Sequence, residues 1–170
     1  LLGELSNKDF LNSDYYNENI TFIGNNDNLK KILKASGLGN PATMQMFLYI
    51  LLVMPKETLS RLDTTTINSW ENALKTTIQS FNVNVTTTYP GESSSDLSTV
   101  NYYRHIRNAV SHAKCVYETE KGRTYVTFKD KAPKNSYHCE IKMLTSDVGS
   151  ILEVLQKQIM IYLNGQWSIR

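Results

Sequence analysis

Apolar side chains recur at intervals of three and four residues in long segments of this 170-residue chain. That period matches one face of an α-helix, so each segment predicts a helix with a buried stripe. Similar stripes run from Met44 to Leu52 and from Val148 to Tyr162. The clearest stripe consists of Ile67, Trp70, Leu74, Ile78 and Phe81. These patterns predict an all-α fold, an up-and-down bundle of four to five helices.

Cap and breaker residues mark the expected ends of these helices. Asn40-Pro41 is typical of a helix start, and Pro55 is expected to interrupt the helix that follows. Residues 64–66 offer caps for the next helix. The last helix is expected from a cap near Ser146-Asp147 to Asn164-Gly165.

Short stretches with β-propensity lie between these helices. Cys115 to Tyr117 and Thr124 to Phe128 flank a turn at Glu120-Lys121-Gly122, and Tyr137 to Met143 follows. We therefore expect a small β-hairpin inserted before the last helix. Residues 82–95, with a threonine run and three serines, predict a flexible loop.

The length suits a single domain with its own core. Residues 1–40 predict an irregular N-terminal segment, with a short strand at residues 20–23 and a short helix from Asp27. Residues 41–170 are expected to form the helical domain.

The net charge of +2 does not by itself indicate a nucleic-acid partner. Residues 104–134, however, contain eight Lys or Arg residues and only three acidic residues. Such a surplus suits a phosphate backbone, and a solvated basic hairpin explains it equally well.

Several function classes have no support in the sequence. The apolar run from Met44 to Met54 is shorter than the roughly 20 residues that span a bilayer. Its internal position also argues against a signal peptide, so we expect a cytoplasmic protein with no membrane partner. Cys115 and Cys139 lack metal-type spacing and predict free thiols. No zinc pattern, glycine-rich phosphate loop or serine nucleophile elbow is present, so we expect no metal and no cofactor.

The segment Arg104 to His112 concentrates cationic, amide and imidazole side chains. Asp96 is expected to cap this helix, which would run to about Lys114. At about 100° per residue, one face is predicted as core. That face holds Val100, Tyr103, Ile106, Val110 and Ala113. The opposite face holds His105, Asn108 and His112, with Arg104 and Ser111 on its flank and Arg107 at its boundary. Periodicity alone favours a plain solvent-exposed face.

These residue types are suited to one reaction, the cleavage of RNA without a metal. The 2′-hydroxyl must lose a proton, the leaving oxygen must gain one, and the phosphorane charge must be stabilised. Histidine exchanges protons near neutral pH, and arginine holds a phosphate while keeping its charge.

Arg107-Asn108-Ala109-Val110-Ser111-His112 resembles the signature of the HEPN superfamily (higher eukaryotes and prokaryotes nucleotide-binding domains). In that signature Arg is followed by a polar residue, usually Asn, Asp or His, and then by His a few positions on. Phe128-Lys129-Asp130, in a hairpin before the last helix, is similar to an element of a bacterial, plasmid-borne HEPN type. The resemblance covers roughly residues 41–164 in layout.

The resemblance implies a helical bundle, usually a homodimer, and metal-independent RNA cleavage in a groove between the two copies. Arg107 would contact the scissile phosphate, His112 would act as general base or acid, and Asn108 would support them. The dimer would supply His112 twice. The implied role is that of a toxin or a phage-defence effector, with an antitoxin or a larger defence complex as partner.

Geometry on the helix and in the hairpin adds candidate RNA-binding residues. They are Arg104, His105, Ser111, Tyr102 as a base-stacking group, Lys129, Lys131 and Lys134. Two alternatives stay open: a non-catalytic HEPN-like module that binds RNA or a protein, and a dimerisation domain of a larger defence protein.

Overall fold

A computed structural model describes residues 41–58 and 63–167 of the chain. The helical elements are α5 (Pro41–Leu48), the π-helical η1 (Tyr49–Val53), α6 (Met54–Thr58), α7 (Thr64–Gln79), the 3₁₀ turn η2 (Leu97–Thr99), α8 (Tyr102–Ser111) and α9 (Thr145–Trp167). The strands are β1 (Asn84–Thr87), β2 (Cys115–Glu120), β3 (Arg123–Lys131) and β4 (His138–Leu144). The short strand and helix expected within residues 1–40 lie outside the described residues.

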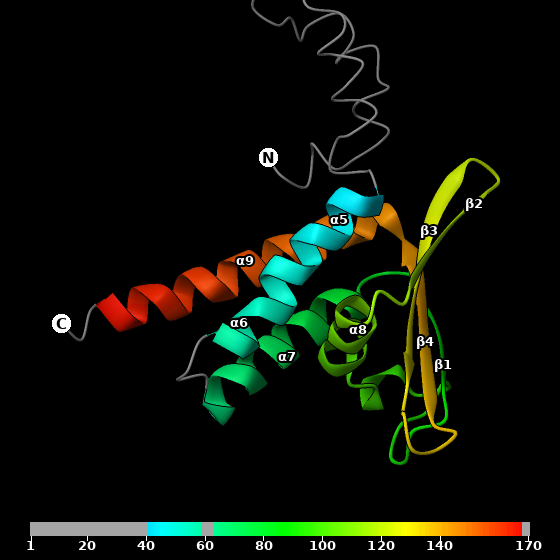
Figure 1. Cartoon of the computed structure of the whole chain (residues 1–170), viewed down its shortest axis with the longest axis horizontal. Coiled ribbons are helices and arrows are strands. Elements are labelled where there is room, and N and C mark those ends of the chain that lie inside the picture. The colour runs from blue at the N-terminus through cyan, green and yellow to red at the C-terminus, as the bar shows by residue number, and fades with distance from the viewer. Residues whose placement is uncertain (1–40, 59–62, 168–170) are drawn as a thin grey trace, which may run out of the picture.

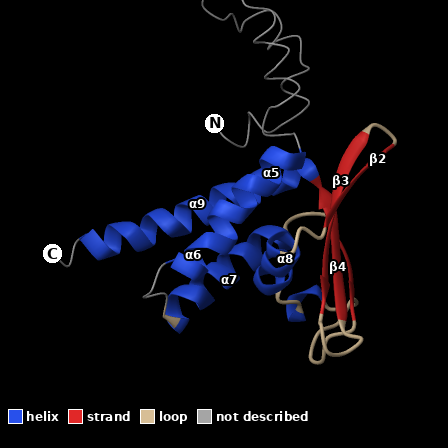
Figure 2. Ribbon diagram, in the orientation of Figure 1, coloured by secondary structure: helices blue, strands red, loops and turns tan. Residues whose placement is uncertain are grey.

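A four-stranded antiparallel sheet, in the order β1-β4-β3-β2, forms one layer of the molecule. Helices cover one of its faces, and α8 lies between the sheet and the other helices (Figures 1 and 2). The prediction of an all-α bundle with a small inserted hairpin is therefore wrong. The long helices were predicted, and so were the strands after residue 114. The assembly of these strands into a sheet layer was not predicted.

Alternating burial explains why β3 and β4 form the centre of this sheet. Cys139, Ile141 and Met143 of β4 are buried, whereas the residues between them are partly exposed. Phe128 of β3 lies opposite Ile141, and Asp130 lies opposite Cys139. The strand period thus places the Asp130 carboxylate on the face that packs against the helices.

The segment predicted as a flexible loop, residues 82–95, contains strand β1. Val85 pairs with Ile141 of β4 and is buried, which ties this segment to the core. β-Branched Thr and Val residues favour an extended backbone. A strand of four residues was too short to show an alternating pattern in the sequence.

Pro55 does not interrupt the first helix, contrary to prediction. The chain stays helical through α5, η1 and α6, with Leu48 and Leu52 fully buried. The Met54 N–H donates to the Tyr49 carbonyl, five residues back, so the turn before the proline is wide. A wide turn accommodates a ring that has no N–H and that clashes with the carbonyl of a preceding α-helical turn.

Helix α7 buries the predicted stripe, with Trp70, Leu74 and Ile78 almost inaccessible. The cap is Asp63 rather than the threonines that follow it, since its carboxylate accepts from the Thr66 N–H. The last helix, α9, begins directly after β4 and continues past the predicted end at residues 164–165.

Helix α8 is shorter than predicted and differently capped. The Asn101 side chain accepts from the Arg104 N–H, whereas Asp96 caps η2. The helix ends at Ser111, and Ala113 adopts a φ of 52° on the surface. Because α8 is packed between a sheet and helices, it buries a wider surface than the single face predicted from its periodicity.

Within the described part of the chain, no helix combines the length and the apolar character needed to cross a bilayer.

Candidate functional site

His105 is buried, not exposed in a groove as predicted. Its side chain is 1% exposed, and Nδ1 lies 2.7 Å from Oδ2 of Asp130 on β3. Nε2 lies 2.8 and 2.9 Å from the two carboxylate oxygens of Glu92. Both carboxylates are nearly inaccessible, at 6% and 8% exposure. We call His105, Asp130 and Glu92 the carboxylate–histidine cluster.

The protonation of this cluster is restricted by its geometry. A neutral imidazole has one N–H, so it can donate to only one of the two carboxylates. Hydrogen bonds on both sides of His105 therefore require an imidazolium, or a proton on Asp130 or Glu92. An imidazolium between two carboxylates compensates buried charge that would otherwise be strongly destabilising.

Further hydrogen bonds connect the two carboxylates to their surroundings. Oδ2 of Asp130 accepts from the Tyr89 hydroxyl at 3.3 Å and from the Asn108 amide at 3.2 Å. Glu92 accepts from the Thr87 hydroxyl at 2.9 Å and from the Asn101 N–H at 3.3 Å. The segment after β1 is thereby held against α8 and β3.

Asn108 connects the buried cluster to Arg107. Its amide nitrogen donates to Asp130, and its Oδ1 accepts from Nη2 of Arg107 at 2.7 Å. Both hydrogen-bonding ends of one amide are thus occupied, which fixes its orientation. Asn108 therefore orients the guanidinium of Arg107, and Asp130 orients Asn108.

Arg107 is half-buried and lies near a second cation, Lys56 of α6. The pKa of Lys56 is lowered, first by burial and then by the charge of Arg107, while Glu71 of α7 acts in the opposite direction. The positive charges of Lys56 and Arg107 repel one another, and the negative charge of Glu71 offsets part of that repulsion.

His112 is exposed and caps the C-terminus of α8. Its backbone N–H donates to the Asn108 carbonyl, as does the Ser111 hydroxyl at 3.0 Å. Arg107 and His112 therefore extend from one short helix whose backbone is fixed at both ends. In the described part of the chain, no hydrogen bond joins their side chains.

The other predicted RNA-binding residues have different surroundings. Arg104 is exposed and its guanidinium lies 4.8 Å from the centre of the Tyr89 ring. Tyr102 is 1% exposed, so the prediction that it stacks on a base is wrong.

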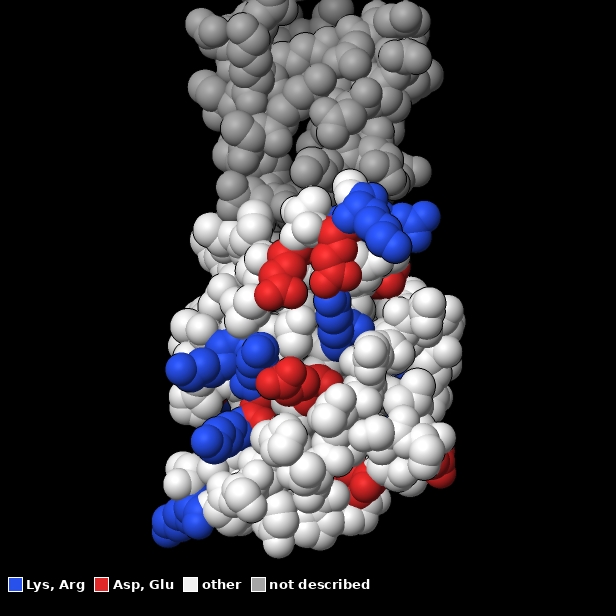
Figure 3. Space-filling model, turned by 90° about the vertical axis from the view of Figure 1, so that its right-hand side faces the viewer, with Lys and Arg blue, Asp and Glu red and all other residues white. Residues whose placement is uncertain are grey.

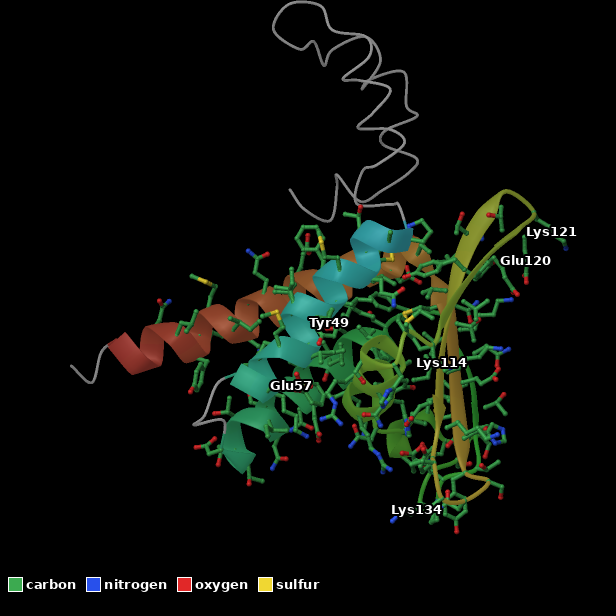
Figure 4. All side chains as sticks on the ribbon, viewed as in Figure 1. Tyr49, Glu57, Lys114, Glu120, Lys121 and Lys134 are labelled. Carbon is green, nitrogen blue, oxygen red and sulfur yellow. The ribbon has the colours of Figure 1, made fainter. Side chains whose placement is uncertain are left out.

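The basic residues of the hairpin region do not form one surface. Lys129 lies 3.6 Å from Glu140, and the outer sheet face mixes both charges (Figure 3). Lys134 and Lys121 lie at opposite ends of the sheet (Figure 4). The local surplus of positive charge seen in the sequence is therefore distributed over both ends of the sheet.

Sequence reasoning assigned no place in the site to Glu92, Asp130, Tyr89 or Cys139. The signal for Asp130 was present, because alternation with Val126 and Phe128 puts it on the buried side of β3. Glu92 gave no signal, since it belongs to the segment predicted as a loop. Both cysteines are free, as predicted. Burial raises the pKa of each thiol to about 12, and at Cys139 the charge of Glu92 adds to this effect.

Comparison with known families agrees with the motif on α8. A family model described as HEPN pEK499 p136 matches residues 3–165. The chain belongs to this HEPN family. The predicted membership of the HEPN superfamily is thereby confirmed. No curated protein and no solved structure matches this HEPN chain.

The first prediction concerns the role of the cluster in stability. Asp130→Ala should lower the free energy of unfolding by about 3–5 kcal/mol, because it removes one of the two carboxylate partners of the buried His105. The exposed pair of Lys129 and Glu140 provides a control, and Glu140→Ala should cost less than about 1 kcal/mol. Urea denaturation monitored by circular dichroism measures both values. Similar losses in the two variants would contradict a central role for Asp130.

Proposed function

We propose that this HEPN protein is a metal-independent endoribonuclease in which Arg107 and His112 carry the reaction. The observation that supports this most directly is the fixed position of Arg107. Its guanidinium is oriented by Asn108, lies near Lys56, and belongs to the same helix as the exposed His112.

The proposed reaction is a transesterification at phosphorus. His112 of one copy takes the proton from the 2′-hydroxyl, and the 2′-oxygen attacks the phosphorus. The bond to the 5′-oxygen breaks, and that oxygen receives a proton from His112 of the other copy. The products are a 2′,3′-cyclic phosphate and a 5′-hydroxyl. Arg107 stabilises the charge that grows on the phosphorane oxygens.

Each side chain near the motif has a distinct part in this proposal. Asn108 is a positioning residue, because it acts through Arg107. Lys56, Arg104, Lys131 and Lys134 contribute positive charge for the RNA backbone. Lys129 contributes less, since Glu140 partly neutralises it. A free ribonuclease is harmful to its own cell, so a role as toxin or defence effector requires an antitoxin or a trigger.

The second prediction tests the chemistry at His112. Wild-type protein should cleave single-stranded RNA in a buffer that contains EDTA, and the products should carry 2′,3′-cyclic phosphate or 3′-phosphate ends. His112→Ala should lower the rate by roughly two to four orders of magnitude, the usual contribution of a positioned acid or base. His138→Ala is the matched control and should cleave like the wild type. Equal cleavage by wild type and His112→Ala would indicate a contaminating nuclease and contradict the assignment.

The third prediction separates catalysis from binding at the two neighbouring cations. Arg107→Ala should lower the single-turnover rate at saturating enzyme, and Arg107→Lys should restore little, because an ammonium lacks the planar fork. Lys56→Ala should weaken RNA binding and flatten its salt dependence while it spares the saturated rate. Lys157→Ala, an exposed lysine on α9, should change neither quantity. An Arg107→Ala protein that cleaves like the wild type would remove Arg107 from the mechanism.

The fourth prediction concerns self-association, which supplies His112 twice. Met46, Tyr49 and Ile50 are exposed apolar residues on the helix that packs against α8 (Figure 4 labels Tyr49). Light scattering at tens of micromolar should show a dimer, and Ile50→Asp should convert it into a monomer. Ile161→Asp, at a similarly exposed position on α9, should remain dimeric. A wild-type monomer would refute the paired-histidine mechanism.

A further inference from the structure

Two members of the carboxylate–histidine cluster also lie close to the thiol of a buried cysteine. Glu92, His105 and Cys139 each contribute one potential ligand atom, and these atoms all lie within 4.8 Å of one another. The residues come from three separate places: the segment after β1, helix α8 and strand β4. The pairing of Cys139 with Asp130 across β3 and β4 brings the thiol to this position.

We propose that Glu92, His105 and Cys139 form a mononuclear binding site for a transition-metal ion of the Zn²⁺ class. One carboxylate oxygen, one imidazole nitrogen and one thiolate are a donor set that suits zinc and its neighbours better than calcium or magnesium. Three protein ligands leave a fourth position for water. The sequence gave no such indication, because the three ligands are not close together in the chain.

The surroundings of His105 support this assignment. A histidine ligand almost always donates its other ring N–H to a carboxylate, a carbonyl or a water. Nδ1 of His105 lies 2.7 Å from Asp130, which leaves Nε2 for the metal. Glu92 is in turn held by the Thr87 hydroxyl and the Asn101 N–H. Two of the three proposed ligands therefore already have the outer partners that a metal site requires.

An unpartnered hydroxyl provides an independent observation. Tyr102 is 1% exposed, and its hydroxyl oxygen has no hydrogen-bond partner among the described residues. The pKa of Tyr102 is raised to about 12, first by burial and then by the charges of Cys139 and Glu92. A buried hydroxyl without a partner is costly, and a metal-bound water would accept its hydrogen bond.

The distances require a small rearrangement. Zinc bonds of about 2.0–2.3 Å in a tetrahedral arrangement place neighbouring ligand atoms roughly 3.3–3.7 Å apart. Nε2 of His105 and the nearer Glu92 oxygen are 2.8 Å apart and must separate slightly. Glu92 lies on an irregular segment rather than in a helix or strand, which permits this shift.

The charges balance when a metal enters. In the imidazolium form, Zn²⁺ displaces one proton from Nε2 of His105 and one proton from the Cys139 thiol. Two protons leave and two positive charges arrive, so the net charge of the buried region does not change. Metal binding therefore releases protons without creating an uncompensated buried charge.

The fifth prediction tests the site with Co²⁺ as a spectroscopic substitute for zinc, in protein first treated with a chelator. Wild-type protein should bind one equivalent and show a sulfur-to-cobalt charge-transfer band in the near ultraviolet. Cys139→Ser should abolish the band, because the thiolate is its source. Cys115→Ser removes the other thiol and should retain it. Zn²⁺ should displace Co²⁺ and raise the melting temperature of the wild type and of Cys115→Ser.

A further variant keeps the proposal falsifiable if Cys139→Ser does not fold. Glu92→Gln should weaken Co²⁺ binding at least tenfold, with a circular dichroism spectrum like that of the wild type, because His105 keeps its pairing with Asp130. The absence of a charge-transfer band in the wild type, or a band that is lost in Cys115→Ser and kept in Cys139→Ser, would overturn the proposal. These measurements use no RNA, so their outcome is independent of the proposed ribonuclease activity.

Discussion

The hydrogen bonds of His105 to two buried carboxylates are the interaction on which the site depends. Asp130 comes from a strand and Glu92 from the segment after β1, so one imidazole joins parts of the chain that are distant in sequence. Removing His105 would leave two carboxylates buried without a compensating positive charge. This requirement explains how a short helix with polar residues can lie between a sheet and a layer of helices.

The same contacts connect stability with chemistry. The chain of hydrogen bonds from His105 through Asp130 and Asn108 ends at Arg107, the residue that the proposal places at the phosphate. Arg107 is therefore oriented from inside the protein rather than by its neighbours on the surface. A guanidinium fixed in this way needs little reorganisation when charge develops in the transition state.

The sequence predicted local elements well and their assembly poorly. Helix α7 and its buried stripe followed from the spacing of Trp70, Leu74 and Ile78. The motif on α8 identified the family. The sheet was missed because β1 has four residues and pairs with a strand more than fifty positions away. The burial of His105 was missed because helical periodicity assigns an imidazole to a polar face, and only tertiary contacts with Asp130 and Glu92 reverse that assignment.

The wide turn formed by η1 sets the rotational phase of the helix that follows it. A π-helical turn contains one residue more than an α-helical turn, which rotates every later side chain by about 100° around the axis. Lys56 lies in the short helix α6 that follows this turn, and the charge of Arg107 contributes to the lowered pKa of Lys56. A deletion of one residue within η1 would restore the regular α-helical rotation of the side chains around the axis. Lys56 would then point away from the motif on α8. The proximity of these two cations thus depends on a local irregularity of the backbone as much as on the residues themselves.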